Sequence, residues 1–246
     1  MSPNHLMSGA AIALFCTTAS ATPIFDTFGP LPQATFGGTG IPNDEVAAGT
    51  QFVDGVNTIT VALSATQRFS NPALTNDDAG TYFATPGSNF GGNGQSTTEG
   101  ALWNFNFYIE VMDGNDDPLP ISNYQFDLLY EFNPSVDTPI ADFGSINITN
   151  SVVFSPDPTA NVAQGSQNLN FGFLASDLPG FLTAPAGSFD PNALGEYTFA
   201  LTVSEIGGLG LPLETVAIDV VVVPSGPTAA LLAPVGVLAM RRRRKA

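Results

Sequence analysis

The stretch from Trp103 to Val111 alternates large apolar and polar side chains, one residue after another. Successive side chains of a β-strand point to opposite faces, so a period of two is typical of a strand with one buried face. No window between the two ends of the chain shows a sustained helical period. The same alternation recurs along the chain, in 58–65, 126–132, 146–154, 169–173, 197–203 and 216–222. The pattern therefore predicts a β protein.

Turn-forming residues separate these stretches, as in 91–94, 113–118 and 155–158. About seven to nine strands, each with one apolar face, bury those faces most simply by packing two sheets together. The segment Gly195–Leu201 resembles the tyrosine-corner strand of immunoglobulin-like domains, with Tyr197 at the corner position. We therefore expect an all-β fold, an antiparallel β-sandwich that is immunoglobulin-like or jelly-roll-like.

The first 21 residues have the features of a signal peptide. Residues 6–13 are mostly apolar, and Ala19 and Ala21 form a small-x-small cleavage site before Thr22. We expect a short signal helix over 1–21 that directs export and is removed. Residues 22–50, rich in Pro, Gly, Thr and Ala, are expected to form an extended leader with one edge strand. Residues 51–223 are predicted to form a single β-sandwich domain.

Removing both ends changes the charge of the chain. Residues 22–223 contain all 22 acidic residues and one basic residue, Arg68, a formal charge of −21 against −16 for the whole chain. They contain neither His nor Cys, which excludes a Ser-His-Asp triad, a cysteine nucleophile and the usual zinc ligands. So acidic a surface also repels nucleic acid. We expect a noncatalytic protein without a nucleic-acid partner.

Carboxylate chemistry leaves a glycoside hydrolase as a third possibility, because two acids suffice for that reaction. The strand pattern places most of the glutamates on polar faces or in loops, where we expect solvated surface acids: Glu99, Glu110, Glu131, Glu196, Glu205 and Glu214. Trp103 fits a core position, whereas Asn104 and Asn106 on the opposite face could line a carbohydrate site.

The segment from Asp113 to Asp117 is the best candidate for a metal site. Asp113, Asn115 and Asp117 have the spacing of alternate ligands in a calcium loop, and calcium prefers oxygen ligands. The later EF-hand positions hold Pro118 and Tyr124, so the segment is not an EF-hand. A hairpin turn explains the same residues. Calcium is thus the one cofactor that the sequence suggests, and a calcium- or carbohydrate-binding adhesion module is the main alternative function.

The chain ends in three distinct parts. Val223, Pro224 and Pro227 belong to a Pro/Gly break, and residues 228–240 form a short apolar stretch. A basic cluster follows, Arg241, Arg242, Arg243, Arg244 and Lys245. Thirteen apolar or small residues fall short of the roughly 17–25 that a membrane-spanning helix needs. The basic cluster favours the cytoplasmic side, so residues 224–246 are expected to pause in the membrane. A short permanent anchor is the alternative.

This tail resembles the C-terminal sorting signal of PEP-CTERM proteins, in which a Val-Pro-Glu-Pro motif precedes an apolar helix and an Arg cluster. The stretch matching the motif is Val223–Pro227. The resemblance implies processing by an exosortase-like enzyme after transient inner-membrane anchoring through a C-terminal sorting helix. It also implies a place at the cell surface or in the extracellular matrix, associated with exopolysaccharide or the cell envelope.

Overall fold

The structure is a computed structural model that describes residues 23–36, 46–69, 74–91, 98–151, 157, 159–207 and 211–224. The predicted cleavage site at Ala19 and Ala21 lies outside the described residues. So do Pro227, the apolar stretch and the basic cluster Arg241–Lys245. Within the described residues, no helix is long and apolar enough to cross a membrane.

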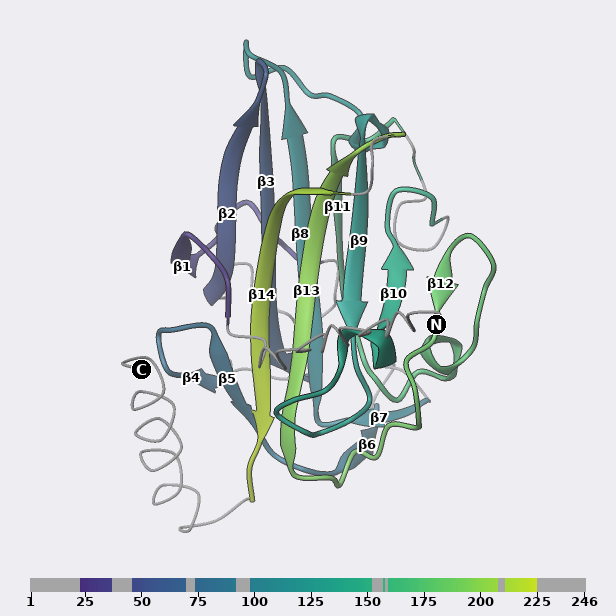
Figure 1. Ribbon diagram of the computed structural model, residues 1–246. Coiled ribbons are helices and arrows are strands. Elements are labelled where there is room, and N and C mark those ends of the chain that lie inside the picture. The colour runs from purple at the N-terminus through teal and green to yellow at the C-terminus, as the bar shows by residue number, and fades with distance from the viewer. Residues whose placement is uncertain are drawn as a thin grey trace, which may run out of the picture.

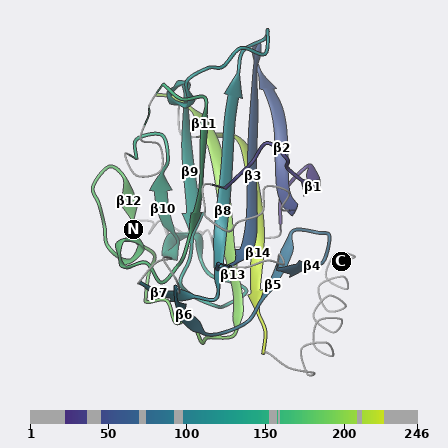
Figure 2. The same ribbon diagram turned by 180° about the vertical axis from the view of Figure 1, so that it is seen from behind.

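Two β-sheets face each other, which confirms the predicted all-β sandwich (Figures 1 and 2). The smaller sheet has the order β1 (Thr27–Pro30), β2 (Val46–Asp54), β3 (Asn57–Gln67), β8 (Trp103–Met112) and β11 (Val162–Gln167). The larger sheet has the order β12 (Leu182–Thr183), β10 (Gly144–Asn147), β9 (Tyr124–Tyr130), β13 (Gly195–Glu205), β14 (Pro212–Val222), β5 (Thr81–Ala84) and β4 (Thr75–Asn76). A hairpin of β6 (Ser88–Phe90) and β7 (Glu99–Ala101) lies at one end.

Aromatic rings fill the space between the sheets. Phe105 of β8 stacks on Phe199 of β13 with ring centroids 4.5 Å apart, and Trp103 meets the same Phe199 edge-on at 6.1 Å. All three rings stand at apolar positions of the alternating stretches. Such rings bury a large apolar area, and that burial stabilises the pairing of the two sheets.

The residues predicted as a leader contribute to the sandwich. They supply β1 and the first part of β2, so the predicted domain boundary at residue 51 falls inside a strand. Ala34 and Phe36 are fully buried against Tyr108, on the outer face of the smaller sheet. The apolar residues of this segment therefore cover a face that would otherwise be exposed.

Two strand assignments differ from the sequence pattern. Residues 169–173 were expected to form a strand, but the chain turns there into a short 3-10 helix, η3 (Gly172–Ala175). The strand that pairs with β8 on the side away from β3 is instead β11, whose residues show no apolar alternation. Its Gly165 lies under Phe107, where a Cβ would stand only 2.8 Å from the ring. β11 forms because its backbone hydrogen-bonds to the edge of β8 that β3 leaves unpaired.

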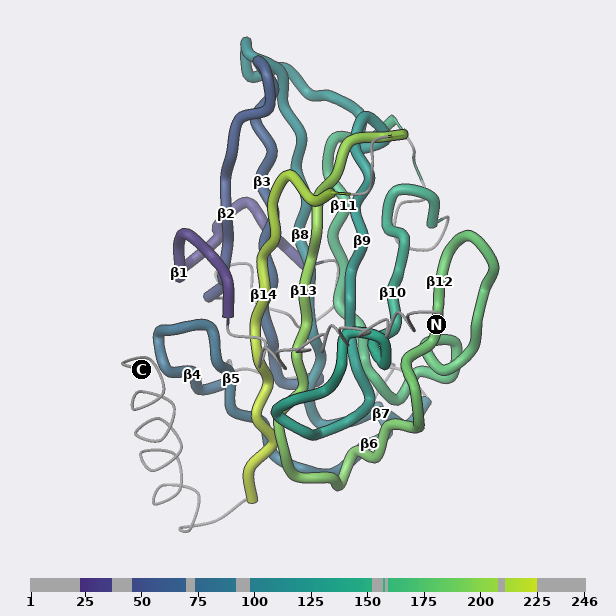
Figure 3. The backbone as a smooth tube through the Cα atoms, in the orientation of Figure 1, coloured from purple at the N-terminus to yellow at the C-terminus, as the bar shows by residue number. Residues whose placement is uncertain are grey.

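The remaining helical turns are η1 (Ile121–Asn123) and η2 (Ile140–Asp142). One strand pair departs from the antiparallel pattern, because β5 runs parallel to β14, with Tyr82 opposite Val220. Parallel neighbours need a long connection, and here the chain from β6 to β13 lies between the two strands. The tube in Figure 3 shows the chain returning through β14 to lie beside β5.

Candidate functional site

The outer face of the larger sheet carries the polar residues of β9, β13 and β14. Residues that alternate with the core positions point away from the other sheet, and the register sets Asp127 opposite Thr202 and Thr198 opposite Asp219. These two pairs lie toward opposite ends of β13. One end forms an open cleft and the other a buried cluster of acids.

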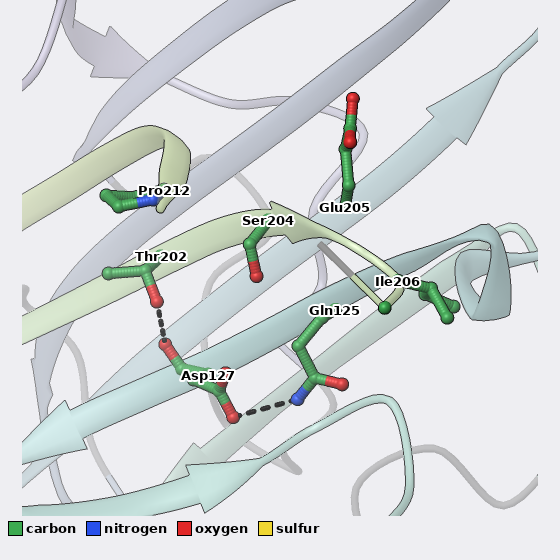
Figure 4. Close-up of a pocket in the computed structure, with 8 residues that line it drawn as sticks. Gln125, Asp127, Thr202, Ser204, Glu205, Ile206 and Pro212 are labelled. Atoms are coloured by element: carbon green, nitrogen blue, oxygen red, sulfur yellow. Dashed lines mark hydrogen bonds between the residues drawn. The ribbon is translucent and has the colours of Figure 1, made fainter. Parts of the chain in front are cut away.

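The cleft has a volume of about 360 Å³, and most of the side chains that line it are polar (Figure 4). Asp127 Oδ1 accepts a hydrogen bond of 3.0 Å from Gln125 Nε2, and the Asp127 carbonyl accepts one of 3.2 Å from Thr202 Oγ1. Partial burial raises the pKa of Asp127 above its usual range. The lining residues are Gln125, Asp127, Thr202, Ser204, Glu205, Ile206, Gly207 and Pro212.

The chemistry of the cleft suits a neutral ligand rich in hydroxyl groups. Carboxylate, amide and hydroxyl side chains supply both acceptors and donors, and Ile206, 58% exposed, adds an apolar contact. Ile206 and Pro212 rather than an aromatic ring form the apolar wall.

The acidic cluster consists of Glu131, Glu196 and Asp219, which are 1%, 5% and 4% exposed. Glu131 and Glu196 were expected to be solvated, and the structure corrects that expectation because both residues are buried. Glu131 Oε1 accepts a hydrogen bond of 2.7 Å from the Thr198 amide, and Thr198 Oγ1 donates one of 2.8 Å to Asp219 Oδ1. A single threonine therefore joins two buried carboxyl groups.

Burial raises the pKa of every member of the acidic cluster. It raises the pKa of Glu131 to about 7, and that of Asp219 to about 8 with a further contribution from Glu196. The pKa of Glu196 is raised by burial and then by Asp137. Arg68, the only Lys or Arg among the described residues, binds the β6–β7 hairpin instead, through the carbonyls of Asn89 and Thr98.

The predicted calcium loop is a self-contained turn. Asp113 Oδ1 accepts hydrogen bonds from the amides of Asn115 at 2.7 Å and Asp117 at 2.9 Å. These bonds lower the pKa of Asp113. The side chains of Asn115 and Asp117 are exposed, and the described residues contain no group of three potential metal-ligating acids, histidines or cysteines. Calcium binding here stays a prediction.

The proposed carbohydrate surface around Asn104 and Asn106 is closed by its own hydrogen bonds. Asn106 is fully buried and donates to Thr66, while Asn104 donates to Ser166 and accepts from Asn168. These amides hold β8 to β3 and β11, Asn104 is half-buried, and a carbohydrate site here stays a prediction. Trp103 is buried in the core as expected.

No family model, curated protein or solved structure matches this chain. Its function is therefore inferred from its own residues.

The described part of the chain ends where the predicted sorting motif begins. The Val223 amide donates a hydrogen bond of 2.9 Å to the Ala84 carbonyl. Among the described residues, this is the last hydrogen bond between the end of β14 and β5. Pro224 has no amide hydrogen, so it cannot extend the ladder. Val223 and Pro224 thus lie at the margin of the larger sheet, and Pro227 and the basic cluster lie outside the described residues.

Sequence reasoning missed both ends of the outer face. The polar alternation of β9 and β13 was visible, but it does not tell which residues face each other across two strands 75 positions apart at Asp127 and Thr202. Register decides that pairing. The sequence alone therefore carried no signal that singles out the residues of the cleft.

Proposed function

We propose that this chain is a noncatalytic exported protein of the cell surface or extracellular matrix, sorted through its PEP-CTERM-like tail. The observation that carries the proposal is the junction at Val223 and Pro224. The last ladder bond of the larger sheet ends there, and the tail follows directly. Removing the tail would leave every described strand pair intact.

The composition of residues 22–223 supports the same proposal. A domain with a formal charge of −21 and without His or Cys suits a soluble module at a surface better than a catalyst. The proposed partners are an exosortase-like processing enzyme and the exopolysaccharide or cell envelope. The apolar stretch would hold the protein in the inner membrane only transiently.

Mass spectrometry of the native protein tests this proposal. We expect a mature N-terminus near Thr22 and loss of the chain after about Pro224. A surface-located protein that still carries Arg241–Lys245 would refute the sorting signal and leave the permanent anchor.

A second candidate function, glycan binding, is favoured by the cleft at Asp127. Its polar lining and the exposed Ile206 match the hydroxyl and C–H surfaces of a sugar. We expect binding on a glycan array that Asp127→Ala and Thr202→Ala weaken together, while Asp116→Asn on an exposed loop leaves it unchanged. Equal binding by all variants would move the glycan site elsewhere.

A further inference from the structure

The segment 133–138 closes over the acidic cluster of Glu131, Glu196 and Asp219. The Pro134 carbonyl accepts a hydrogen bond of 3.1 Å from the Glu196 amide, which docks the segment onto β13. Gly195 has φ 147°, and a Cβ at this position would collide with the Pro134 carbonyl. The close approach of the segment to the sheet therefore requires glycine.

Few hydrogen-bond donors serve the three carboxyl groups, and one of them, the Thr138 hydroxyl of the closing segment, lowers the pKa of Glu131. Thr198 supplies two, its amide to Glu131 Oε1 and its hydroxyl to Asp219 Oδ1. Glu131 Oε2 is buried without a hydrogen-bond partner. A buried carboxylate oxygen without a donor is costly when it is charged, but not when it carries a proton.

The charged groups that face the cluster make ionisation harder still. Asp137 of the closing segment faces Glu196, and Asp77 of the β4–β5 turn faces Asp219. On β9, β13 and β14 the neighbouring charges are the cluster's own members, Glu131, Glu196 and Asp219. Every one of these groups is an acid, so each carboxylate that ionises raises the cost of ionising the next.

We propose that the buried carboxyl groups of Glu131 and Asp219, packed with Glu196 on one covered face, hold protons near neutral pH and form a proton-operated latch that keeps segment 133–138 closed on the larger sheet. Loss of these protons at alkaline pH charges the buried face and releases the segment. The latch is independent of the sorting signal and of the cleft.

The direction of the pH effect follows from where the protons bind. The folded protein holds protons that an unfolded chain, with carboxyl pKa values of about 4, has already released. The contribution of the cluster to stability is therefore fully present at about pH 4 and below, and it falls as the pH rises through the folded pKa values of about 7 for Glu131 and about 8 for Asp219.

Hydrogen exchange on the full chain tests the latch. After correction for intrinsic rates, we expect amides of 135–138 to exchange roughly tenfold faster at about pH 9 than at about pH 6. The double variant Glu131→Gln/Asp219→Asn keeps the acceptor oxygens but cannot ionise there. It should raise Tm at the higher pH and remove most of the difference, and Asp116→Asn should change neither.

Infrared spectroscopy detects the protonated carboxyl groups directly, whether or not segment 133–138 opens. We expect a protonated carboxylic-acid band at neutral pH that the double variant loses. If the double variant does not fold, Glu196→Gln and the wild-type spectrum answer the same question.

Three outcomes would overturn the latch. The first is equal protection of 135–138 at both pH values, and the second is the absence of an acid band at neutral pH. The third is a rise of Tm with calcium chloride at neutral pH that these variants lose, because a cation would then be neutralising the carboxylates in place of protons.

Discussion

At the scale of single residues, buried tyrosines show how unevenly the core satisfies its polar groups. The Tyr82 hydroxyl donates a hydrogen bond of 2.8 Å to the Val46 carbonyl, which links the two sheets. The Tyr130 hydroxyl donates one of 2.7 Å to the Leu174 carbonyl. The Tyr197 hydroxyl is buried without a hydrogen-bond partner. A tyrosine corner is closed by a hydrogen bond from the Tyr hydroxyl to the backbone, and Tyr197 makes no such bond in the described structure. Tyr197 is instead an aromatic core side chain against Trp103.

We predict opposite effects for the Tyr→Phe substitutions at these sites. Tyr130→Phe should cost about 1–2 kcal/mol of unfolding free energy, because it leaves a buried carbonyl unpaired. Tyr197→Phe should be neutral or stabilising, because it removes an unsatisfied hydroxyl. Chemical denaturation of both variants and of Tyr82→Phe measures the contrast. An equal loss at positions 130 and 197 would contradict it.

Arg68 fixes the β6–β7 hairpin to the rest of the domain. The residue is 4% exposed. Its guanidinium donates a hydrogen bond of 2.7 Å to the Asn89 carbonyl and one of 2.8 Å to the Thr98 carbonyl, and it lies over the Phe69 ring. A planar fork can reach two carbonyls that a single ammonium cannot.

We predict that Arg68→Ala destabilises the fold by about 2–4 kcal/mol, through unpaired carbonyls and a cavity. Arg68→Lys should restore only part of this stability. Thermal and urea unfolding would reveal the difference, and full rescue by Lys would show that charge alone is sufficient.

At the scale of elements, two acidic loops are built in the same way. Asp113 Oδ1 accepts from the amides two and four residues later, and Asp77 Oδ1 does the same with Ala79 and Thr81. In each loop the fourth residue has a positive φ, 61° at Asp116 and 88° at Gly80. The first aspartate of each loop therefore organises a turn, which explains its presence without a metal.

We predict that Asp113→Ala lowers Tm in calcium-free buffer and that Asp117→Ala does not, since only the first carboxylate holds the turn. The lowered pKa of Asp113 means that its contribution is present at neutral pH and is lost as the pH falls through that pKa. Differential scanning fluorimetry with and without calcium separates the two explanations. A calcium-dependent rise of Tm that both variants abolish would establish a calcium site instead.

At the scale of the whole molecule, the sandwich is closed before the tail begins. β14 lies between β13 and β5, so the last strand among the described residues is an inner strand of its sheet. Val220 and Val222 of β14 are buried in the core. The domain therefore needs the chain as far as Val223 but has no described contact that requires the tail.

We predict that a chain ending at Pro224 keeps the Tm of the full-length protein within about 2 °C. A chain ending at Ala217 should not fold, because it lacks the half of β14 that pairs with β5. Circular dichroism melts of both truncations measure this. Unfolding of the Pro224 truncation would show that the tail is part of the fold and would count against a detachable signal.

The alternation of apolar residues was enough to predict β3, β8, β9, β13 and β14, because side-chain direction along a strand is a local property. It also identified the core faces and placed Trp103 inside. It failed at β11, where backbone pairing and the packing of Phe107 over Gly165 decide the structure. It also failed at 169–173, where the alternation ends in a 3-10 turn.

The sequence by itself determined the fold class, the acidic and His-free character of residues 22–223, and the three-part tail. Only the tertiary structure decided that Glu131, Glu196 and Asp219 share one buried face and that Asp127 meets Thr202 in a cleft. The reason is physical. Periodicity reports which side of its own strand a residue occupies, whereas burial of a polar face depends on register and on the segments that fold over it.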